Sequence, residues 1–362
     1  MGTELSPDIV LLRILPRLPA KSAVRFTCVS KEWNSFLTTP TFANMHLHHQ
    51  NRHKLLFKSY TTLSCTFRTI DCEAPEDGLT PPRYLPFKLA RNMSVITSFN
   101  GMVCVGIPHN GMNSEYSDLI LWNPLTCDYK TLSKTNSCNE CYQTNTRASV
   151  LNYISSEDDY KLLLVTHSCS IYIYSLKFDL WRKTEDIRRL SFSNHNALLN
   201  EKLYFLKEDN DKADDVYVYS IISLDLKTTE KFIDVATPIL KNTHTTCLGF
   251  TILRGCIHIW MRNFLQIDLW RMDGDGDWTK VVAYWGTIDF PHILYQQPLH
   301  LMADGNWLLL YQYCLYKTYP EKVYNCACTY TTTRYKYRYL DLGITRLGKY
   351  LETLVSPNQY MK

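Results

Sequence analysis

The sequence lacks a strong excess of charge of either sign. Its 362 residues include 39 Lys and Arg and 35 Asp and Glu, a net charge of +4. Nucleic-acid binders carry a basic patch or stripe, so this balance gives no electrostatic case for a nucleic-acid partner. Glycine (13) and proline (15) are also scarce, which excludes collagen-like and Pro/Gly-rich low-complexity chains.

Long apolar runs are absent as well. The longest uncharged stretch, residues 92–114, contains Gly101, Pro108 and His109, so it is not expected to span a membrane. The first apolar run is interrupted by Arg13 and does not resemble a signal peptide. We therefore expect a protein of the cytoplasm and/or nucleus whose 13 cysteines are reduced, packed thiols. Residues 1–6 match the minimal pattern for myristoylation of Gly2, but so short a pattern does not decide the question.

The chain contains enough apolar residues for a large core, because 45% of its residues are hydrophobic. Single cores stop growing at about 250–300 residues. The length therefore favours two parts, or a repeat architecture with an appendage.

The first 45 residues predict three helices. Ser6 and Pro7 are a typical helix start, and the following residues to Leu18 are apolar nearly all round, so this helix must be buried on most sides. Pro16 is expected to end or kink it. A second helix covers residues 22–29, and Ser30 is the predicted cap of a third that stops at Thr39.

This region resembles an F-box. The resemblance rests on an ordered set of strings: Leu5-Ser6-Pro7-Asp8-Ile9, residues 14–22 (ILPRLPAKS), Arg25-Phe26, residues 29–33 (VSKEW) and Pro40-Thr41-Phe42. Two positions depart from the family pattern. Ser6 replaces a proline, and Pro16 stands where a polar residue is usual, which could shift the turn and weaken partner docking.

The resemblance implies that the module binds the Skp-family adaptor of a Skp–cullin–F-box (SCF) ubiquitin ligase through an apolar interface. Some of the residues carried over must instead hold the helices together, and the sequence does not separate the two roles. The residues carried over are Leu5, Pro7, Ile9, Leu12, Leu15, Leu18, Pro19, Val24, Val29 and Trp33.

After the helices, the pattern changes to short apolar runs separated by turn residues, which indicates many strands. A strand–turn–strand unit recurs at residues 119–132, 171–183, 221–232 and 265–281, and a further strand precedes each unit. Aligning Leu121, Tyr174, Ser223 and Ile267 gives offsets of 53, 49 and 44 residues, which lie near the period of about 40–50 residues of kelch and WD-type propellers.

These units resemble the F-box-associated, kelch-type domain of plant F-box proteins. The supporting residues include Asn100-Gly101, residues 121–124 (LWNP), Trp181, residues 278–280 (WTK) and residues 352–358 (ETLVSPN). We therefore expect a mainly β protein: a small α-helical F-box (residues 1–47), then a kelch-like β-propeller (48–362) with six blades favoured over seven. The match is weakest at 60–95 and 285–335.

Several short patterns contain possible metal ligands, but none of them predicts a metal site. Residues 272–278 (MDGDGDW) lack the Gly and Glu positions of a calcium loop and predict a hairpin turn. The pairs Cys138/Cys141 and Cys326/Cys328 are far apart for a zinc site. The histidines 46, 48, 49 and 53 predict a polar linker. No cofactor or metal is therefore expected.

Two further patterns favour ordinary strands and turns. The alternation of Tyr and basic residues over 335–339 predicts a half-buried strand rather than a nucleic-acid surface. The acidic residues around 201–215 predict a solvated hairpin, although a docking site for a basic partner stays open.

The leading functional hypothesis is a non-catalytic substrate receptor of an SCF ubiquitin ligase, in which the F-box binds the adaptor, and through it a cullin, while the propeller recruits a target protein. No nucleic-acid or membrane partner is expected. A propeller module acting outside the ligase is the alternative, and a copper oxidase on a kelch-like propeller is a weaker one, because no ligand spacing supports it. The target and the loops that bind it are not predicted.

Overall fold

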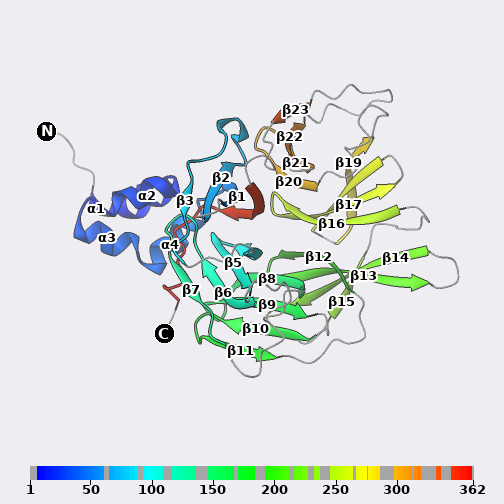
Figure 1. The fold of residues 1–362 in the computed structure, drawn as a ribbon, viewed down its shortest axis with the longest axis horizontal. Coiled ribbons are helices and arrows are strands. Elements are labelled where there is room, and N and C mark those ends of the chain that lie inside the picture. Colours follow the sequence, from blue (N-terminus) through cyan, green and yellow to red (C-terminus); the bar gives the residue numbers. More distant parts are fainter. Residues whose placement is uncertain are drawn as a thin grey trace.

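The computed structural model describes residues 6–60, 65–87, 93–108, 116–134, 146–166, 170–183, 192–211, 216–226, 232–236, 245–263, 266–274, 276–285, 297–311, 314–318, 332–335 and 344–360. It consists of an N-terminal helical module followed by a β-propeller (Figure 1). No helix within the described residues has the length and apolar character needed to cross a membrane.

The helical module contains four α-helices, one π-helical turn, which is wider than an α-helix, and one 3-10 turn, which is tighter. They are α1 (Pro7–Ile9), the π-helical turn η1 (Val10–Ile14), the 3-10 turn η2 (Leu15–Arg17), α2 (Ala20–Phe26), α3 (Lys31–Leu37) and α4 (Pro40–Leu47). The predicted first helix is thus broken into three pieces. The predicted Ser30 cap is confirmed, since its hydroxyl accepts the Trp33 N–H at 3.1 Å. The third helix ends at Leu37, just before the predicted stop, and Thr39 caps α4, which the sequence did not predict.

The strands form six four-stranded antiparallel sheets. Five of them use strands that are consecutive in the chain. The first of these sheets contains β4 (Ser94–Phe99), β5 (Met102–Pro108), β6 (Tyr116–Trp122) and β7 (Tyr129–Thr131), and the second contains β8 (Thr146–Ile154), β9 (Asp159–Thr166), β10 (Ile171–Ser175) and β11 (Leu180–Lys183). The third contains β12 (Phe192–Leu199), β13 (Lys202–Asp211), β14 (Val216–Asp225) and β15 (Phe232–Val235), and the fourth contains β16 (Thr245–Leu253), β17 (Cys256–Asn263), β18 (Gln266–Met272) and β19 (Trp278–Trp285). The fifth contains β20 (Gln297–Leu301), β21 (Trp307–Tyr311), β22 (Cys314–Thr318) and β23 (Thr332–Tyr335).

The remaining sheet joins distant parts of the chain. Its order is β24 (Ile344–Leu351), β1 (His53–Tyr60), β2 (Cys65–Asp71) and β3 (Arg83–Tyr84), so the last described strand completes a sheet begun by the first. The 3-10 turn η3 (Pro75–Asp77) lies between β2 and β3. The register pairs His53 with Leu351 and Lys54 with Tyr350. The chain therefore returns to its start, as a closed propeller requires.

The first strand of each sheet contacts the first strand of the next: β24 contacts β4, β4 contacts β8, β8 contacts β12, β12 contacts β16 and β16 contacts β20. Apolar clusters fill the spaces between neighbouring sheets, for example Leu56 and Phe67 with Val105 and Trp122. The Trp122 ring meets the Phe67 ring edge-on, at 4.8 Å between centroids. The sheets are thus held together mainly by buried apolar surface.

Polar contacts also bridge neighbouring sheets, one or more at each of six junctions. In chain order, they are Arg83 Nη1 to Pro124 O (3.1 Å), Trp181 Nε1 to Ser133 O (3.1 Å), Ser155 N to Glu201 Oε1 (3.1 Å), Trp278 Nε1 to Ala236 O (2.6 Å), Arg254 Nη2 to Met302 O (3.0 Å) and His300 Nε2 to Glu73 Oε1 (2.7 Å). The last contact joins the sheet of β20 to the sheet of β1. It lies at the point where the ring of sheets closes.

The repeat predicted from sequence is confirmed for its four units, because the predicted runs are the middle and outer strands of four sheets. One aligned position is wrong. Ile267 lies near the start of β18, whereas Leu121, Tyr174 and Ser223 lie near the ends of β6, β10 and β14. The sequence favoured six units over seven. Five of the six sheets are each formed by strands that follow one another in the chain: the four that contain the predicted units and the sheet of β20–β23. The sixth combines β1, β2 and β3 with the distant β24.

Candidate functional site

Large apolar side chains are exposed along the first helical turns. Ile9 and Leu12 are each 46% exposed, and Ile14 is 38% exposed. We call these three residues the apolar ridge. The other exposed large apolar residues of the described chain stand mostly on outer strands of separate sheets, as do Tyr84, Ile233 and Val281. The ridge is therefore a candidate surface for a protein partner.

Exposed basic side chains are frequent on the helical module that carries the ridge. Arg13, Arg17, Lys21, Arg25 and Lys31 are all exposed. Among the described residues of the helical module, the exposed acidic ones are Asp8 and Glu32. A partner docking here would meet an apolar strip with a mainly basic rim, which favours a partner surface carrying carboxylates.

The predicted adaptor-binding residues divide into three groups. Ile9, Leu12 and Val29 are exposed, with Val29 at 59%. Leu18, Val24 and Trp33 are half-buried and pack against the core, and Pro19 is half-buried. Leu15 is only 1% exposed and belongs to the core itself. Leu5 lies outside the described residues, and Pro7 begins α1 without a described side chain.

The buried side of the helical module is continuous with the propeller core. Leu15, Ala23 and Phe42 share one apolar cluster with Leu121 and Tyr160 of the sheets. Phe42 is fully buried, and its ring packs against Phe36 at 5.4 Å. The sequence did not separate the apolar residues that hold the module together from those that bind a partner. In the structure, one set packs on the propeller and the ridge faces solvent.

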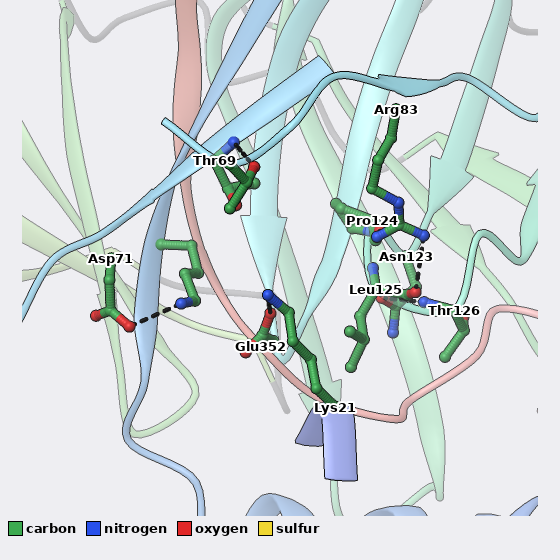
Figure 2. Close-up of polar contacts among 11 residues, drawn as sticks. Lys21, Thr69, Asp71, Arg83, Asn123, Pro124, Leu125, Thr126 and Glu352 are labelled. Carbon is green, nitrogen blue, oxygen red and sulfur yellow. Dashed lines mark hydrogen bonds and ion pairs between the residues drawn. The ribbon is translucent and has the colours of Figure 1, made fainter. Parts of the chain in front are cut away.

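Residues 352–360 tie the helices to the sheets, and we call this segment the C-terminal strap. The Gln359 side chain donates to the Thr38 carbonyl at 2.8 Å, and the Tyr360 hydroxyl bonds to the Asn44 side chain at 3.0 Å. The Tyr360 ring packs edge-on against Tyr160 of β9, at 4.8 Å. Lys21 of α2 and the buried Glu352 form an ion pair at 3.9 Å, drawn in Figure 2.

Asn123 anchors the strap to the propeller. Its side-chain amide donates to the carbonyls of Thr353 (3.0 Å) and Val355 (2.7 Å), while its Oδ1 accepts the Leu125 N–H at 2.8 Å. Figure 2 shows Asn123 in the turn with Pro124 and Leu125, beside Arg83. The resemblance drew attention to this residue as part of LWNP, but not to its contacts.

Gly101 allows the strap to approach the sheets closely. Its φ of +87° lies in the region that favours glycine, and a Cβ added there would lie 2.0 Å from the Thr353 hydroxyl oxygen. That hydroxyl donates to the Asn100 carbonyl at 2.8 Å. The Asn100-Gly101 pair is therefore needed at the contact between the β4–β5 turn and the strap.

The prediction of a polar histidine linker is wrong at two of its four positions. His46 is fully buried in α4, and its Nε2 donates to the Leu18 carbonyl at 3.0 Å. Burial lowers the pKa of His46, more than the hydrogen bond to Leu18 raises it. His53 begins β1 and packs against the His300 ring at 5.3 Å. His48 and His49 are exposed at the end of α4.

The other patterns considered for metal chemistry have structural roles or lie outside the described residues. The chain turns between β18 and β19, as predicted, where the Asp273 N–H donates to the Asp277 carbonyl at 2.8 Å; residue 275 lies outside the described part. Cys138, Cys141, Cys326 and Cys328 lie outside the described part. Within the part that is described, no group of three or more His, Cys, Asp or Glu residues could hold a metal ion.

The acidic run lies on a β-hairpin, as predicted, since β13 and β14 pair from Lys202 with Asp225 to Asp211 with Val216. Asp214 and Asp215 lie outside the described residues. The predicted strand over 335–339 is described only at Tyr335, the last residue of β23.

Family models match both parts of the chain. The F-box domain model matches residues 7–44, and the F-box associated beta propeller domain model matches residues 90–258. The first match covers the helices that carry the ridge. The second covers the sheets from the β4 region to β17.

Relatives in Arabidopsis thaliana match this chain over most of its length. "F-box/kelch-repeat protein At3g23880" is 25% identical over 393 residues, covering 97% of this chain and 96% of its own. "Putative F-box protein At3g10240" is 26% identical over 286 residues, covering 72% of this chain and 69% of its own.

Solved structures show only a distant likeness. A quinonprotein alcohol dehydrogenase-like protein from Bacteroides thetaiotaomicron has a TM-score of 0.42 and 12% identity, over 82% of this chain and 78% of that chain. The β-propeller domain of the trilobed protease from Pyrococcus furiosus has a TM-score of 0.38 and 14% identity, over 64% of each chain.

A helical module carrying an F-box and a β-propeller of the F-box-associated type together define the class of the protein. The chain is a plant F-box protein, with relatives of the same kind in Arabidopsis. F-box proteins are generally receptor or adaptor subunits rather than catalysts, and an F-box implies an adaptor of the Skp family as the kind of partner.

Proposed function

We propose that the protein is a substrate receptor of an SCF ubiquitin ligase. The observation that carries this proposal is the exposed apolar ridge on the F-box, because most other apolar side chains of the F-box, Val29 excepted, are buried or pack against the core. The ridge would dock on a Skp-family adaptor, and through it the chain would join a cullin scaffold. The proposal places the protein in the cytoplasm or nucleus.

The propeller would hold the target protein without bond chemistry of its own. Binding raises the local concentration of the target near the ubiquitin-conjugating enzyme, which is the source of the rate gain. We further propose that the six sheets act as six blades of one ring. The F-box and strap occupy the turns around Asn100, Asn123 and Tyr160. The target would use a surface that they leave free.

Binding to a recombinant Skp-family adaptor tests the proposal. Leu12→Asp should lower the affinity of the full chain at least tenfold, about 1.4 kcal/mol, because it places a charge in an apolar contact. Val281→Asp is a matched control, since Val281 is 42% exposed on β19, outside the F-box. Titration calorimetry measures both.

A wild-type chain that fails to bind any Skp-family adaptor would contradict the proposal. It would favour the alternative of a propeller module acting outside the ligase. Because Leu15 and Phe42 belong to the propeller core, point variants are better tests than removal of the F-box, which would expose that core. Capture by the Leu12→Asp chain, followed by mass spectrometry, would enrich targets that are bound but not ubiquitinated.

A further inference from the structure

The first F-box helix changes its winding just before Pro16. Residues 10–14 form a π-helical turn in which the Leu15 N–H donates to the Val10 carbonyl, five residues back. Residues 15–17 then form a 3-10 turn that ends with the Leu18 N–H donating to the Leu15 carbonyl at 3.2 Å. A wide turn is thus followed at once by a tight one.

Pro16 gives a physical reason for this change. A proline at position 16 lacks the N–H that would bond to the Leu12 carbonyl in an α-helix, and its ring would collide with that carbonyl. A wider turn before the proline is one way to avoid this collision. The Arg17 guanidinium donates to the Arg13 carbonyl, which satisfies another acceptor that the α-helical pattern would have used.

The wide turn changes which side chains share a face. In an α-helix residues three and four apart lie together, whereas in a π-helical turn residues five apart do. Ile9 and Ile14 are five apart, and both are exposed. Val10 and Leu15 are also five apart; Val10 is half-buried against the core and Leu15 is in it.

The family pattern assigns adaptor contact to Leu15, but the structure leaves almost none of Leu15 at the surface. Its exposed fraction is 1%, against 38% for Ile14. Pro16 itself is buried beneath the same turn. At this point of the helix, the apolar side chain offered to a partner is therefore displaced by one residue along the sequence, while Ile9 and Leu12 stay exposed.

We infer that Ile14, in place of Leu15, is an adaptor-contacting residue of this F-box, brought beside Ile9 by the π-helical turn before Pro16. The occupant is the Skp-family adaptor, because the turn lies inside the F-box match at residues 7–44. The inference rests on the proposed function. Pro16 would then change the pattern of adaptor contacts rather than remove the binding surface.

Affinity of the full chain for a recombinant Skp-family adaptor tests the inference. Ile14→Asp should weaken binding at least tenfold. Ile233→Asp is the matched control, because it makes the same change at an isoleucine that is 57% exposed on β15 of the propeller. Leu15→Met, which keeps the side-chain volume, should bind within twofold of the unchanged chain.

Circular dichroism and thermal unfolding complete the test. Both aspartate variants should keep the unfolding midpoint of the unchanged chain, because each position is exposed. Adaptor affinity unaltered by Ile14→Asp would overturn the inference, and so would unfolding of that variant, since it would show Ile14 to be internal. An unchanged chain that binds no adaptor would instead overturn the proposed function, so the two failures are distinguishable.

Discussion

Asn123 shows how one side chain can hold two distant segments together. It is fully buried, and every polar atom of its side chain has a partner in the strap or in its own turn. If the Asn123 amide nitrogen were replaced by an oxygen, that oxygen would face two carbonyl oxygens at hydrogen-bond distance. The stability lost would exceed that lost with an exposed hydrogen bond, because water does not replace a buried partner.

Asn123→Asp should therefore destabilise the folded protein by roughly 2–4 kcal/mol, since the new oxygen meets the Thr353 and Val355 carbonyls. Equilibrium urea unfolding of the full chain measures this change. Asn34→Asp is the matched control, because Asn34 is exposed on α3 and should change stability by less than about 0.5 kcal/mol. Equal unfolding midpoints for the two variants would contradict the anchoring role of Asn123.

Among the described residues, four histidines have a pKa lowered chiefly by burial: His46, His53, His258 and His300. The pKa of His53 falls to about 3, helped by the nearby charge of Lys349 and by His300. These side chains are neutral when folded, but in the unfolded chain they take up protons below about pH 6.5. Their contribution to stability is complete above that pH and declines as the pH falls.

The free energy of unfolding should therefore decrease between pH 7.5 and pH 5.5, by up to about 1.4 kcal/mol per pH unit for each such histidine. The lowered pKa of Asp71 does not act in this range, because that carboxyl titrates at lower pH. Urea midpoints at the two pH values measure the effect. His53→Asn should reduce the slope and His48→Asn, at an exposed position, should not; identical slopes for all three proteins would refute the assignment.

At the scale of elements, the C-terminal strap fixes the F-box on the propeller. Gln359 and Tyr360 bond to α3 and α4, while Tyr360 also packs on β9. The F-box is then part of the rigid body formed by the sheets, and not a module on a flexible linker. The distance between adaptor and target would be set by the fold.

Tyr360→Ala should lower the free energy of unfolding by about 3 kcal/mol, because it leaves a cavity beside Tyr160 and an unpaired Asn44 side chain. It should also speed proteolysis between α4 and β1. Asn358→Ala, one exposed residue of the same strap, is the control. Unchanged proteolysis of both variants would contradict a fixing role for the strap.

Local patterns allowed several elements to be predicted. The Ser30 cap, the end of α3 shortly before Thr39 and the four repeated hairpins all follow from signals within a few residues. The first strands of the sheets were harder, because β4 is half-buried along its whole length and shows no alternation. The pairing of β24 with β1 joins the two ends of the chain and leaves no local signal.

The candidate site was predicted only in outline. The F-box strings identified the right region and a kink at Pro16, but not the wide turn that exposes Ile14 and buries Leu15. That outcome depends on how the F-box packs on the propeller, because the core that receives Leu15 is built partly from β6 and β9. Tertiary packing, rather than the motif, decides which apolar residues are left for a partner.

At the scale of the molecule, each of the six junctions between neighbouring sheets has a polar bridge, and four of them also have a described apolar cluster. Most of the bridges end on a backbone atom of the adjoining sheet, such as Pro124 O or Met302 O. The junction between the sheets of β20 and β1 depends instead on two side chains, Glu73 and His300, with the Ala303 N–H as a further donor to Glu73.

The completion of the first sheet by β24 also bears on synthesis of the protein. While the chain emerges from the ribosome, β1 has β2 on one side and an open edge on the other until residues 344–351 arrive. The strap follows directly after β24, so the F-box also lacks its final attachment until then. A product that stops early would expose both an unpaired strand and apolar helix surface, features that favour aggregation and degradation. Only chains read through to the last sheet-forming strand would yield a receptor with its F-box in place.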